Sequence, residues 1–218
     1  MEDFTKKYSP KTIGDIVFKS TNEQQQIMDI VNGEVPFPTT KCGILLHGLW
    51  GTGKSELAKL LPDAIEMNKT GNCSNYHYQR IGTGNDGVRV VTMIEQQASF
   101  MPLGSSYHYF VLDEIDRLKA DVMDSFKQAM NLPNSVFILT TNNISAIDGG
   151  VLSRCVRIAF NAPPADAWLP KVKQIFADYG LSRTDKELID AIALCKGDVR
   201  EIFYTVQRII AADLKSSA

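Results

Sequence analysis

The chain has 218 residues, of which 44% are hydrophobic and 22% charged, so it can form one sizeable core with a small satellite domain. Its 23 Lys and Arg residues against 25 Asp and Glu give a formal net charge of −2, which excludes nucleic-acid binding through overall positive charge. No stretch approaches the roughly 18 apolar residues of a membrane span, and the start MEDFTKKYSP has no apolar signal core. We therefore expect a cytoplasmic protein, or a nuclear one in a eukaryote, that is not secreted and has no membrane partner.

The first clear element is the short apolar run GILLH at 43–47, which predicts a buried strand. After a glycine-rich turn, the segment SELAKLL predicts a helix that begins near Ser55. Because proline lacks the N–H that an inner helical turn needs, we expect Pro62 to interrupt this helix.

Further strands alternate with helical segments along the next hundred residues. A weak strand at 77–81 precedes the turn TGNDG and a helix that ends near Ala98. Three stronger strands, rich in β-branched and aromatic residues, are expected at 108–112, 135–141 and 156–160, and a helix lies between the first two. Alternation of this kind predicts an α/β fold with a parallel five-stranded sheet covered by helices on both faces.

The pattern changes at Pro163 and Pro164, which mark a boundary. From there to the end only helical periodicity is found, most clearly in apolar residues spaced three and four apart between Val199 and Ile210. The sequence thus predicts an α/β domain at 1–162 and a small domain of about three helices at 163–218.

The turn after the first strand reads GLWGTGKS and fits the phosphate-binding P-loop pattern G-x-x-x-x-G-K-S. Its glycines let backbone N–H groups wrap an anion, and the following helix adds the positive end of its dipole. Lys54 is expected to reach the β and γ phosphates of ATP, and the Ser55 hydroxyl to ligate Mg²⁺. The alternative is a strand–turn–helix corner that matches by accident. The candidate nucleotide-binding residues here are Gly48, Gly51, Thr52, Gly53, Lys54, Ser55 and Glu56.

A second candidate element is the apolar strand that ends in the adjacent acids Asp113 and Glu114. Beside a phosphate loop, such a strand end is a Walker B arrangement. Asp113 would hold the magnesium ion, largely through water, and Glu114 would act as the general base toward the attacking water. The alternative is an exposed acidic turn at the start of a helix.

Residues 4–17, FTKKYSPKTIGDIV, are similar to the N-terminal segment W-V-E-K-Y-R-P-K-T-L-D-D-V-V of one AAA+ family. The chain resembles the small ATPase subunits of sliding-clamp loaders, which include replication factor C small subunits, bacterial τ/γ subunits and their phage counterparts. The resemblance implies that this segment, with Tyr8 and Pro10, closes over the adenine side of the nucleotide. Ser9 stands where the family has an arginine, so no phosphate contact is implied there.

Two motifs in the second half of the core resemble the same family. TTNN at 140–143 matches the sensor 1 strand end, which implies that Asn142 hydrogen-bonds the γ-phosphate or the attacking water. LSRC at 152–155 matches the Ser-Arg-Cys motif, which implies that Arg154 is an arginine finger placed in a neighbouring subunit's ATP site. The alternative for Arg154 is a surface arginine in a loop that leads into a strand.

GDVRE at 197–201 matches the start of the sensor 2 helix of the family, which implies that Arg200 faces the phosphates. The alternative for Arg200 is an ion pair on the helix surface. The family's small subunits continue into a helical collar domain that holds a pentamer together. This chain ends where a collar would begin, so we interpret it as a fragment or as a reduced relative of viral or mobile-element origin.

The resemblance also implies partners. These are duplex or primer–template DNA, other AAA+ subunits or further copies of the same chain, and a sliding clamp. The positions that match DNA contacts lie around 83–89 and at 117–119, and the candidates are Arg89, Arg117 and Lys119. The alternative is that these segments are ordinary solvated loops.

The leading interpretation is a Mg-ATP-dependent AAA+ ATPase that acts in DNA replication as a clamp-loader-like subunit and hydrolyses ATP at subunit interfaces. One alternative is another DNA-metabolism AAA+ ATPase, of the helicase-loader or transposition-regulator type. A non-hydrolysing architectural subunit is disfavoured by the intact Glu114. A small-molecule kinase with a P-loop would leave Arg154 and the helical lid without a role.

Overall fold

A computed structural model describes residues 4–82 and 86–216. Its centre is a five-stranded sheet with the order β2-β3-β4-β1-β5, in which every neighbouring pair is parallel. The prediction of a parallel α/β sheet is therefore confirmed, and strand bounds differ from the expected ones by at most one residue at either end. The strands are β1 (Gly43–His47), β2 (Tyr76–Arg80), β3 (His108–Asp113), β4 (Ser135–Thr141) and β5 (Cys155–Ala159).

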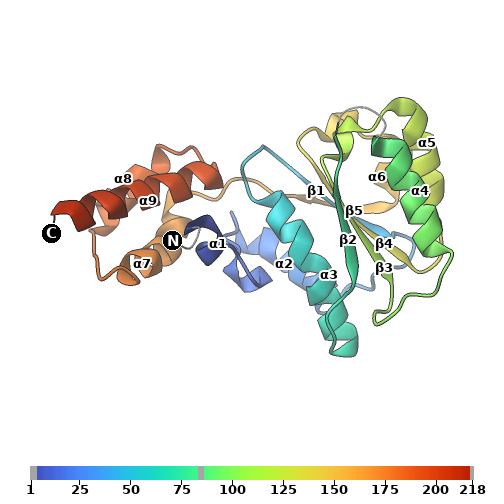
Figure 1. The fold of residues 1–218 in the computed structure, drawn as a ribbon, viewed down its shortest axis with the longest axis horizontal. Helices are drawn as coiled ribbons and strands as arrows, with labels where there is room; N and C mark the ends of the chain where they lie inside the picture. Colours follow the sequence, from blue (N-terminus) through green and yellow to red (C-terminus); the bar gives the residue numbers. More distant parts are fainter. Residues whose placement is uncertain (1–3, 83–85, 217–218) are drawn as a thin grey trace.

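Helices cover both faces of the sheet, as Figure 1 shows. One face packs against α2 (Thr21–Val31) and α3 (Lys54–Thr70), whose apolar side chains share a buried cluster with β1. The other face packs against α4 (Asp86–Ala98), α5 (Ala120–Ala129) and α6 (Gly149–Ser153). This two-sided burial explains why the central strands read as nearly continuous apolar runs.

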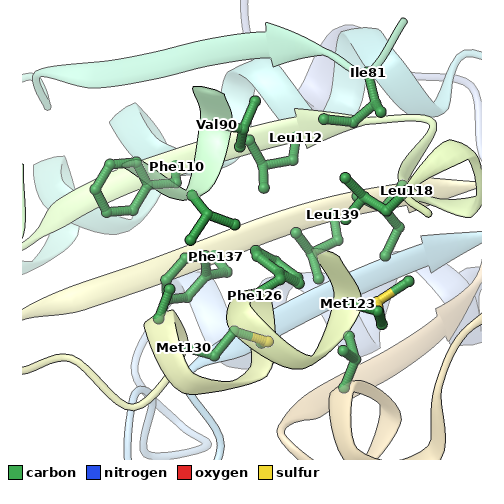
Figure 2. Packing of buried hydrophobic residues seen from close by; sticks show 14 of the residues in the cluster. Ile81, Val90, Phe110, Leu112, Leu118, Met123, Phe126, Met130, Phe137 and Leu139 are labelled. Carbon is green, nitrogen blue, oxygen red and sulfur yellow. The ribbon is translucent and has the colours of Figure 1, made fainter. Parts of the chain in front are cut away.

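The packing on the second face is seen from close by in Figure 2. Phe110 from β3 and Phe137 from β4 stack with ring centroids 5.4 Å apart, and Phe126 from α5 meets Phe137 edge-on at 5.8 Å. All three side chains have no exposed surface. This aromatic layer fixes β3 and β4 side by side, and these two strands end at the residues from which the site is built.

The expectation that Pro62 interrupts its helix is wrong, because α3 continues through Pro62 to Thr70. Leu61, Pro62 and Ile65 are all buried on the sheet side of the helix. The apolar burial on either side of the proline offsets the one backbone hydrogen bond that proline cannot donate. The helix ends instead at Gly71, whose positive φ of 77° makes a left-handed cap.

The remaining helices form a separate group at one end of the molecule (Figure 1): α7 (Leu169–Ala177), α8 (Asp185–Ala193) and α9 (Val199–Ser216). The N-terminal helix α1 (Phe4–Tyr8) joins this group, since Phe4 is buried in the same apolar cluster as residues of α7, α8 and α9. Within the described parts of the chain, no helix is long and apolar enough to cross a membrane. Short 3-10 helices occupy Ile13–Asp15, Ile115–Arg117, Ile144–Ala146 and Ala165–Trp168.

Candidate nucleotide-binding site

The glycine-rich turn lies between the end of β1 and the start of α3 and adopts a conformation that depends on its glycines. Gly51 has a φ of 76°, and a Cβ atom there would lie 2.5 Å from Cγ of Asp198. At Gly48, a Cβ atom would lie 2.2 Å from the carbonyl oxygen of Phe160. Larger residues at these two positions would therefore push the loop away from β5 and α9.

Lys54 is the first residue of α3, and only 6% of its surface is exposed. Its Nζ donates to the carbonyl oxygen of Gly48 at 3.0 Å and to that of Leu49. Burial lowers the pKa of Lys54 to about 8, while the charge of nearby Asp113 acts in the opposite direction. The ammonium group is thus held over the loop, where phosphate oxygens could replace the two carbonyl acceptors.

Asp113 ends β3 and is buried among hydroxyl groups. The Ser55 hydroxyl donates to its Oδ1 at 2.8 Å, the Thr140 hydroxyl donates to the same oxygen, and Tyr78 donates to Oδ2 at 3.2 Å. Burial and the negative charge of Asp113 raise the pKa of Tyr78 to about 12, so the phenol remains a donor. A hydroxyl beside a carboxylate is a set of hard oxygen ligands that fits Mg²⁺.

Among the described residues, no group of three or more His, Cys, Asp or Glu side chains could hold a metal ion. The Ser55–Asp113 pair therefore supplies too few ligands to bind a cation tightly by itself. Mg²⁺ is commonly bound through one or two protein oxygens, with phosphate and water oxygens completing the octahedron. The residues present fit that mode and point to a nucleotide-linked magnesium ion.

Glu114 adopts a left-handed backbone conformation, with a φ of 61°, directly after β3. Its N–H donates to the Thr140 hydroxyl at 3.0 Å. Two arginines flank its carboxylate: Nη2 of Arg80 donates to Oε1 at 2.6 Å, and Nε of Arg117 lies 2.9 Å from Oε2. The second approach is at ion-pair distance but lacks hydrogen-bond geometry, so Oε2 keeps its capacity to accept a hydrogen bond.

These groups line one groove with a volume of about 300 Å³. Six segments of the chain contribute to it: the N-terminal segment, the P-loop with the start of α3, the ends of β2, β3 and β4, and the start of α9. Of the predicted site residues, the groove contains Pro10, Gly51, Thr52, Gly53, Lys54, Ser55, Glu56, Asp113, Glu114, Asn142 and Arg200.

The helix α9 touches the P-loop directly. The N–H of Val199 donates to the carbonyl oxygen of Gly51 at 2.8 Å, and the N–H of Arg200 donates to Oδ1 of Asp198 at 2.9 Å. The positive charge of Arg200 also acts to lower the pKa of Lys54, after the larger effect of burial. The start of α9 therefore lies close enough to the P-loop for the charge of Arg200 to act on Lys54.

Asn142 directly follows β4 and lines the groove. Its N–H donates to Oδ1 of Asp116 at 3.4 Å, and the Thr141 hydroxyl donates to the same oxygen at 2.7 Å. These bonds tie the end of β4 to the turn after Glu114. Asn142 and the candidate base Glu114 thereby line the same groove.

Two of the residues predicted to bind the nucleotide, Tyr8 and Gly48, do not line this groove. The Tyr8 hydroxyl donates to Oδ2 of Asp178 at 3.0 Å, and its ring packs edge-on against Phe4 with centroids 4.9 Å apart. Tyr8 therefore belongs to the helical group, while Pro10 alone of that pair lines the groove. Gly48 contributes only its carbonyl oxygen, which accepts from Lys54.

Arg154 also lies outside the groove, at the end of α6. The sequence reveals no partner for it, but the structure supplies two. Its Nε donates to Oδ1 of Asn131 at 2.9 Å, and its Nη1 donates to the carbonyl oxygen of Gly150 at 2.7 Å. A separate hollow of about 460 Å³ contains this guanidinium together with Lys127.

The three residues predicted to contact DNA differ from one another in their surroundings. Arg89 is exposed on α4, and Lys119 is exposed directly before α5. Arg117 is exposed but pairs with Glu114. The part of the expected DNA-contact segment at 83–85 lies outside the described residues.

Sequence reasoning missed four residues of the groove or its wall: Tyr78, Arg80, Thr140 and Trp50. The first three hold Asp113 or Glu114, and Trp50 is 68% exposed at the groove's edge. Thr140 is part of TTNN, a signal that could have found it. Tyr78 and Arg80 become visible only once β2 pairs with β3 in register, with Tyr78 beside Val111 and Arg80 beside Asp113.

Comparison with known proteins agrees with this geometry. Residues 44–162 match the family described as ATPase family associated with various cellular activities (AAA), and the chain belongs to this family. The match covers β1, the P-loop, the Asp113–Glu114 strand end and β5. The nucleotide-binding fold class is thereby shown.

The resemblance to clamp-loader small subunits is also confirmed by curated relatives. Replication factor C subunit 4 of Caenorhabditis elegans is 26% identical over 227 residues, which cover 98% of this chain and 64% of that protein. The replication factor C small subunit of Archaeoglobus fulgidus is 27% identical over 215 residues, with coverages of 95% and 64%. The chain thus spans just under two thirds of the length of these relatives.

Among solved structures, the Thermotoga maritima RuvB Holliday junction branch migration motor superposes with a TM-score of 0.75. The aligned part covers 99% of this chain and 68% of RuvB at 15% sequence identity. At this identity the likeness shows the fold alone. It extends over the sheet and the helical group together.

Proposed function

We propose that this chain is a Mg-ATP-dependent AAA+ ATPase that acts in DNA replication as a clamp-loader-like subunit. The observation that carries the proposal is the Ser55 hydroxyl 2.8 Å from Oδ1 of Asp113, in a groove that also contains Lys54 and Glu114. Family membership and the replication factor C relatives support the same conclusion. In this proposal, residues 1–162 form the nucleotide-binding domain and residues 163–218 the lid.

The residues have distinct roles in the proposed reaction. The P-loop N–H groups and Lys54 bind the phosphates, and Ser55 and Asp113 hold the magnesium ion. When bound, the metal neutralises charge on the β and γ phosphate oxygens. Glu114 orients a water molecule and accepts its proton, while Asn142 and Arg200 contact the γ-phosphate.

Arg154 would act in the nucleotide site of a neighbouring subunit, either a second copy or a related AAA+ chain. Its place at the end of α6, outside its own groove, supports this role. An arginine supplied in this way stabilises the charge that spreads over the γ-phosphoryl oxygens. Each active site would then be formed by two chains.

The two arginines that flank Glu114 suggest how DNA would be coupled to hydrolysis. Arg80 and Arg117 are both about half exposed, at 58% and 47%, whereas Glu114 is 16% exposed. DNA phosphates can therefore compete for the arginines from solvent and release the carboxylate toward a water molecule. Contacts of this kind are independent of sequence and weaken with salt.

A sliding clamp would dock on the apolar tip, which we define as Phe100, Met101 and Leu103. These side chains are 72%, 75% and 85% exposed. Hydrogen bonds hold the first residue of the tip and the segment that follows it. His108 bonds the carbonyl oxygen of Phe100 at 2.8 Å, and Ser106 donates to buried Glu66. Exposed apolar groups gathered in one short segment are typical of protein-binding surfaces.

The chemistry is tested by two substitutions and a control. Lys54→Ala should abolish ATP binding, whereas Glu114→Gln should bind ATP but release phosphate slowly. Lys69→Ala, which removes an exposed lysine near the other end of the same helix that donates to the Tyr107 hydroxyl, should do neither. Equilibrium binding and phosphate release separate the three, and parental turnover by Glu114→Gln would exclude Glu114 as the base.

A further inference from the structure

Arg154 is fixed at both its backbone and its side chain. Its carbonyl oxygen accepts from the N–H of Cys42 at 3.1 Å and from that of Gly43 at 3.0 Å, which attaches it to the start of β1. Its Nη1 donates to the carbonyl oxygen of Gly150 in its own helical turn. Its Nε donates to the side chain of Asn131, which lies 23 residues away in the turn just after α5.

The partners of this guanidinium are neutral, although acids lie nearby. Asp124 and Asp148 approach Nζ of Lys127 at 2.6 Å and 3.2 Å, and Asp148 also accepts from the N–H of Gly150. Lys127 thus forms ion pairs with both carboxylates. Arg154 is oriented without being neutralised, so its full charge remains available to an anion.

The remaining N–H groups define a binding edge. A guanidinium has five N–H donors, and the contacts to Asn131 and Gly150 use two of them. Within the described parts of the chain, Nη2 has no hydrogen-bond or ion-pair partner. A free arginine side chain loses about 2 kcal/mol of rotamer entropy when it is fixed. Here part of that ordering is present before any ligand arrives.

We propose that Asn131 is a positioning residue, which aims the free edge of the Arg154 guanidinium at the phosphates of a nucleotide held by a neighbouring subunit. This inference rests on the proposed function, in which Arg154 acts between chains. Asn131 itself touches neither nucleotide nor water in the neighbouring site. Its effect passes entirely through the Nε bond.

The first test is Asn131→Ala, with Gln128→Ala as the matched control. Gln128 lines the same hollow, but among the described residues the side-chain hydrogen bonds of Arg154 go to Asn131 and Gly150. Hydrogen bonds to charged groups contribute enough for Asn131→Ala to slow hydrolysis about 10- to 100-fold. ATP binding by the variant should be unchanged, because its own groove is intact. Gln128→Ala should hydrolyse at the parental rate.

A mixing experiment separates a positioning role from a merely structural one. Lys54→Ala protein cannot bind ATP but offers an intact Arg154 and Asn131. Added to Asn131→Ala or to Arg154→Ala protein, it should restore hydrolysis at the mixed interfaces. A mixture of Asn131→Ala with Arg154→Ala should stay slow, since neither chain supplies a correctly aimed guanidinium.

The nucleotide-free protein gives a readout that does not depend on activity. The ¹⁵Nε signal of Arg154, assigned by its loss in Arg154→Lys, should be sharp in the parent protein and in Gln128→Ala. It should shift and broaden in Asn131→Ala. An unchanged signal would show that Asn131 does not orient the side chain and would overturn the inference.

The outcomes also distinguish a failure of this inference from a failure of the proposed function on which it rests. If Lys54→Ala fails to restore Arg154→Ala in a mixture shown by mass to co-assemble, both the action between chains and the inference are overturned. If Arg154→Ala is restored but Asn131→Ala hydrolyses at the parental rate, the inference alone is overturned. A slow Asn131→Ala that Lys54→Ala protein cannot restore would also count against it.

Discussion

Nη2 of Arg80 lies 2.6 Å from Oε1 of Glu114, so the last residue of edge strand β2 holds the proposed catalytic base at the end of β3. The hydrogen bond occupies one of the two carboxylate oxygens with which Glu114 could bind a water molecule. Since Arg80 is far more exposed than Glu114, an external anion can remove the arginine while leaving the carboxylate in place. The pair therefore has the properties of a restraint on hydrolysis.

Arg80→Ala should raise the ATPase rate without DNA severalfold, because Glu114 loses this restraint. The additional stimulation by primed DNA should shrink, since one of the two arginines through which DNA acts is gone. Phosphate release with and without DNA, at one fixed salt concentration, measures both effects. Arg157→Ala, which removes an exposed arginine from the opposite edge strand, serves as the control. A variant with a lower basal rate would show that Arg80 assists Glu114.

Nucleotide binding should depend on pH through Lys54. Burial lowers its pKa to about 8 in the free protein, and bound phosphates would raise it again by stabilising the charged form. Above pH 8, binding must therefore take up a proton, and ADP affinity should fall roughly tenfold between pH 7.5 and pH 9. Calorimetry in two buffers with different ionisation enthalpies measures the uptake directly. Constant affinity across this range, in protein shown to be folded at pH 9, would contradict the assignment.

Much of the fold can be predicted from local patterns in the sequence. Four of the five strands are largely apolar runs, and β2, which reads YHYQR, gives only a weak signal. Because all five alternate with helical segments, a parallel sheet was predictable. The helix α2 was not predicted, although Ser20 caps it by accepting from the N–H of Glu23 at 3.3 Å. The expectation that Pro62 would end the helix gave too much weight to one missing hydrogen bond. The apolar burial around Pro62 stabilises the helix by more than that bond costs.

The residues of the candidate site also fall into those that the sequence predicts and those that it does not. Residues within contiguous motifs, such as Lys54, Ser55, Asp113 and Asn142, were predictable because each motif carries its own chemistry. Arg80 and Asn131 were not, since their roles depend on strand register and on the packing of α5 against α6. Contacts between segments far apart in sequence leave no local pattern to read.

The apolar tip should be needed for clamp binding and dispensable for ATP binding. Leu103→Ser removes the most exposed of its side chains, and Leu194→Ser, at 81% exposure in the helical group, is the matched control. The probe is the sliding clamp encoded by the same genome, with affinity measured by light scattering or calorimetry in the presence of an ATP analogue. Leu103→Ser should weaken binding at least tenfold, while Leu194→Ser leaves it unchanged. Equal affinities of the two variants for the clamp would show that the clamp docks on another surface.

Glu66 should stabilise the fold from beneath this tip. Its side chain on α3 has no exposed surface and accepts from the Tyr109 hydroxyl at 2.8 Å and from the N–H and hydroxyl of Ser106 at 2.8 and 2.9 Å. Burial raises the pKa of Glu66, but the bonds from Tyr109 and Ser106 outweigh it and hold the pKa below its ordinary value of 4.5. The carboxylate therefore stays charged and keeps all of these donors satisfied at neutral pH.

Glu66→Leu leaves several buried donors without an acceptor, at a cost of about 1–3 kcal/mol for each unsatisfied group. For a chain of this size, each kcal/mol lowers the melting temperature by roughly 2–4 °C. Because the folded pKa lies below 4.5, the contribution of the carboxylate is complete above pH 4.5 and is lost as pH falls through the folded pKa. The difference in unfolding free energy between the parent and Glu66→Leu should thus be constant near neutrality and shrink in acid. Glu95→Leu, on the exposed face of α4, should change stability little at either pH. Urea titrations at pH 7 and pH 3.5 give both differences, and a gap that widens in acid would contradict this account of Glu66.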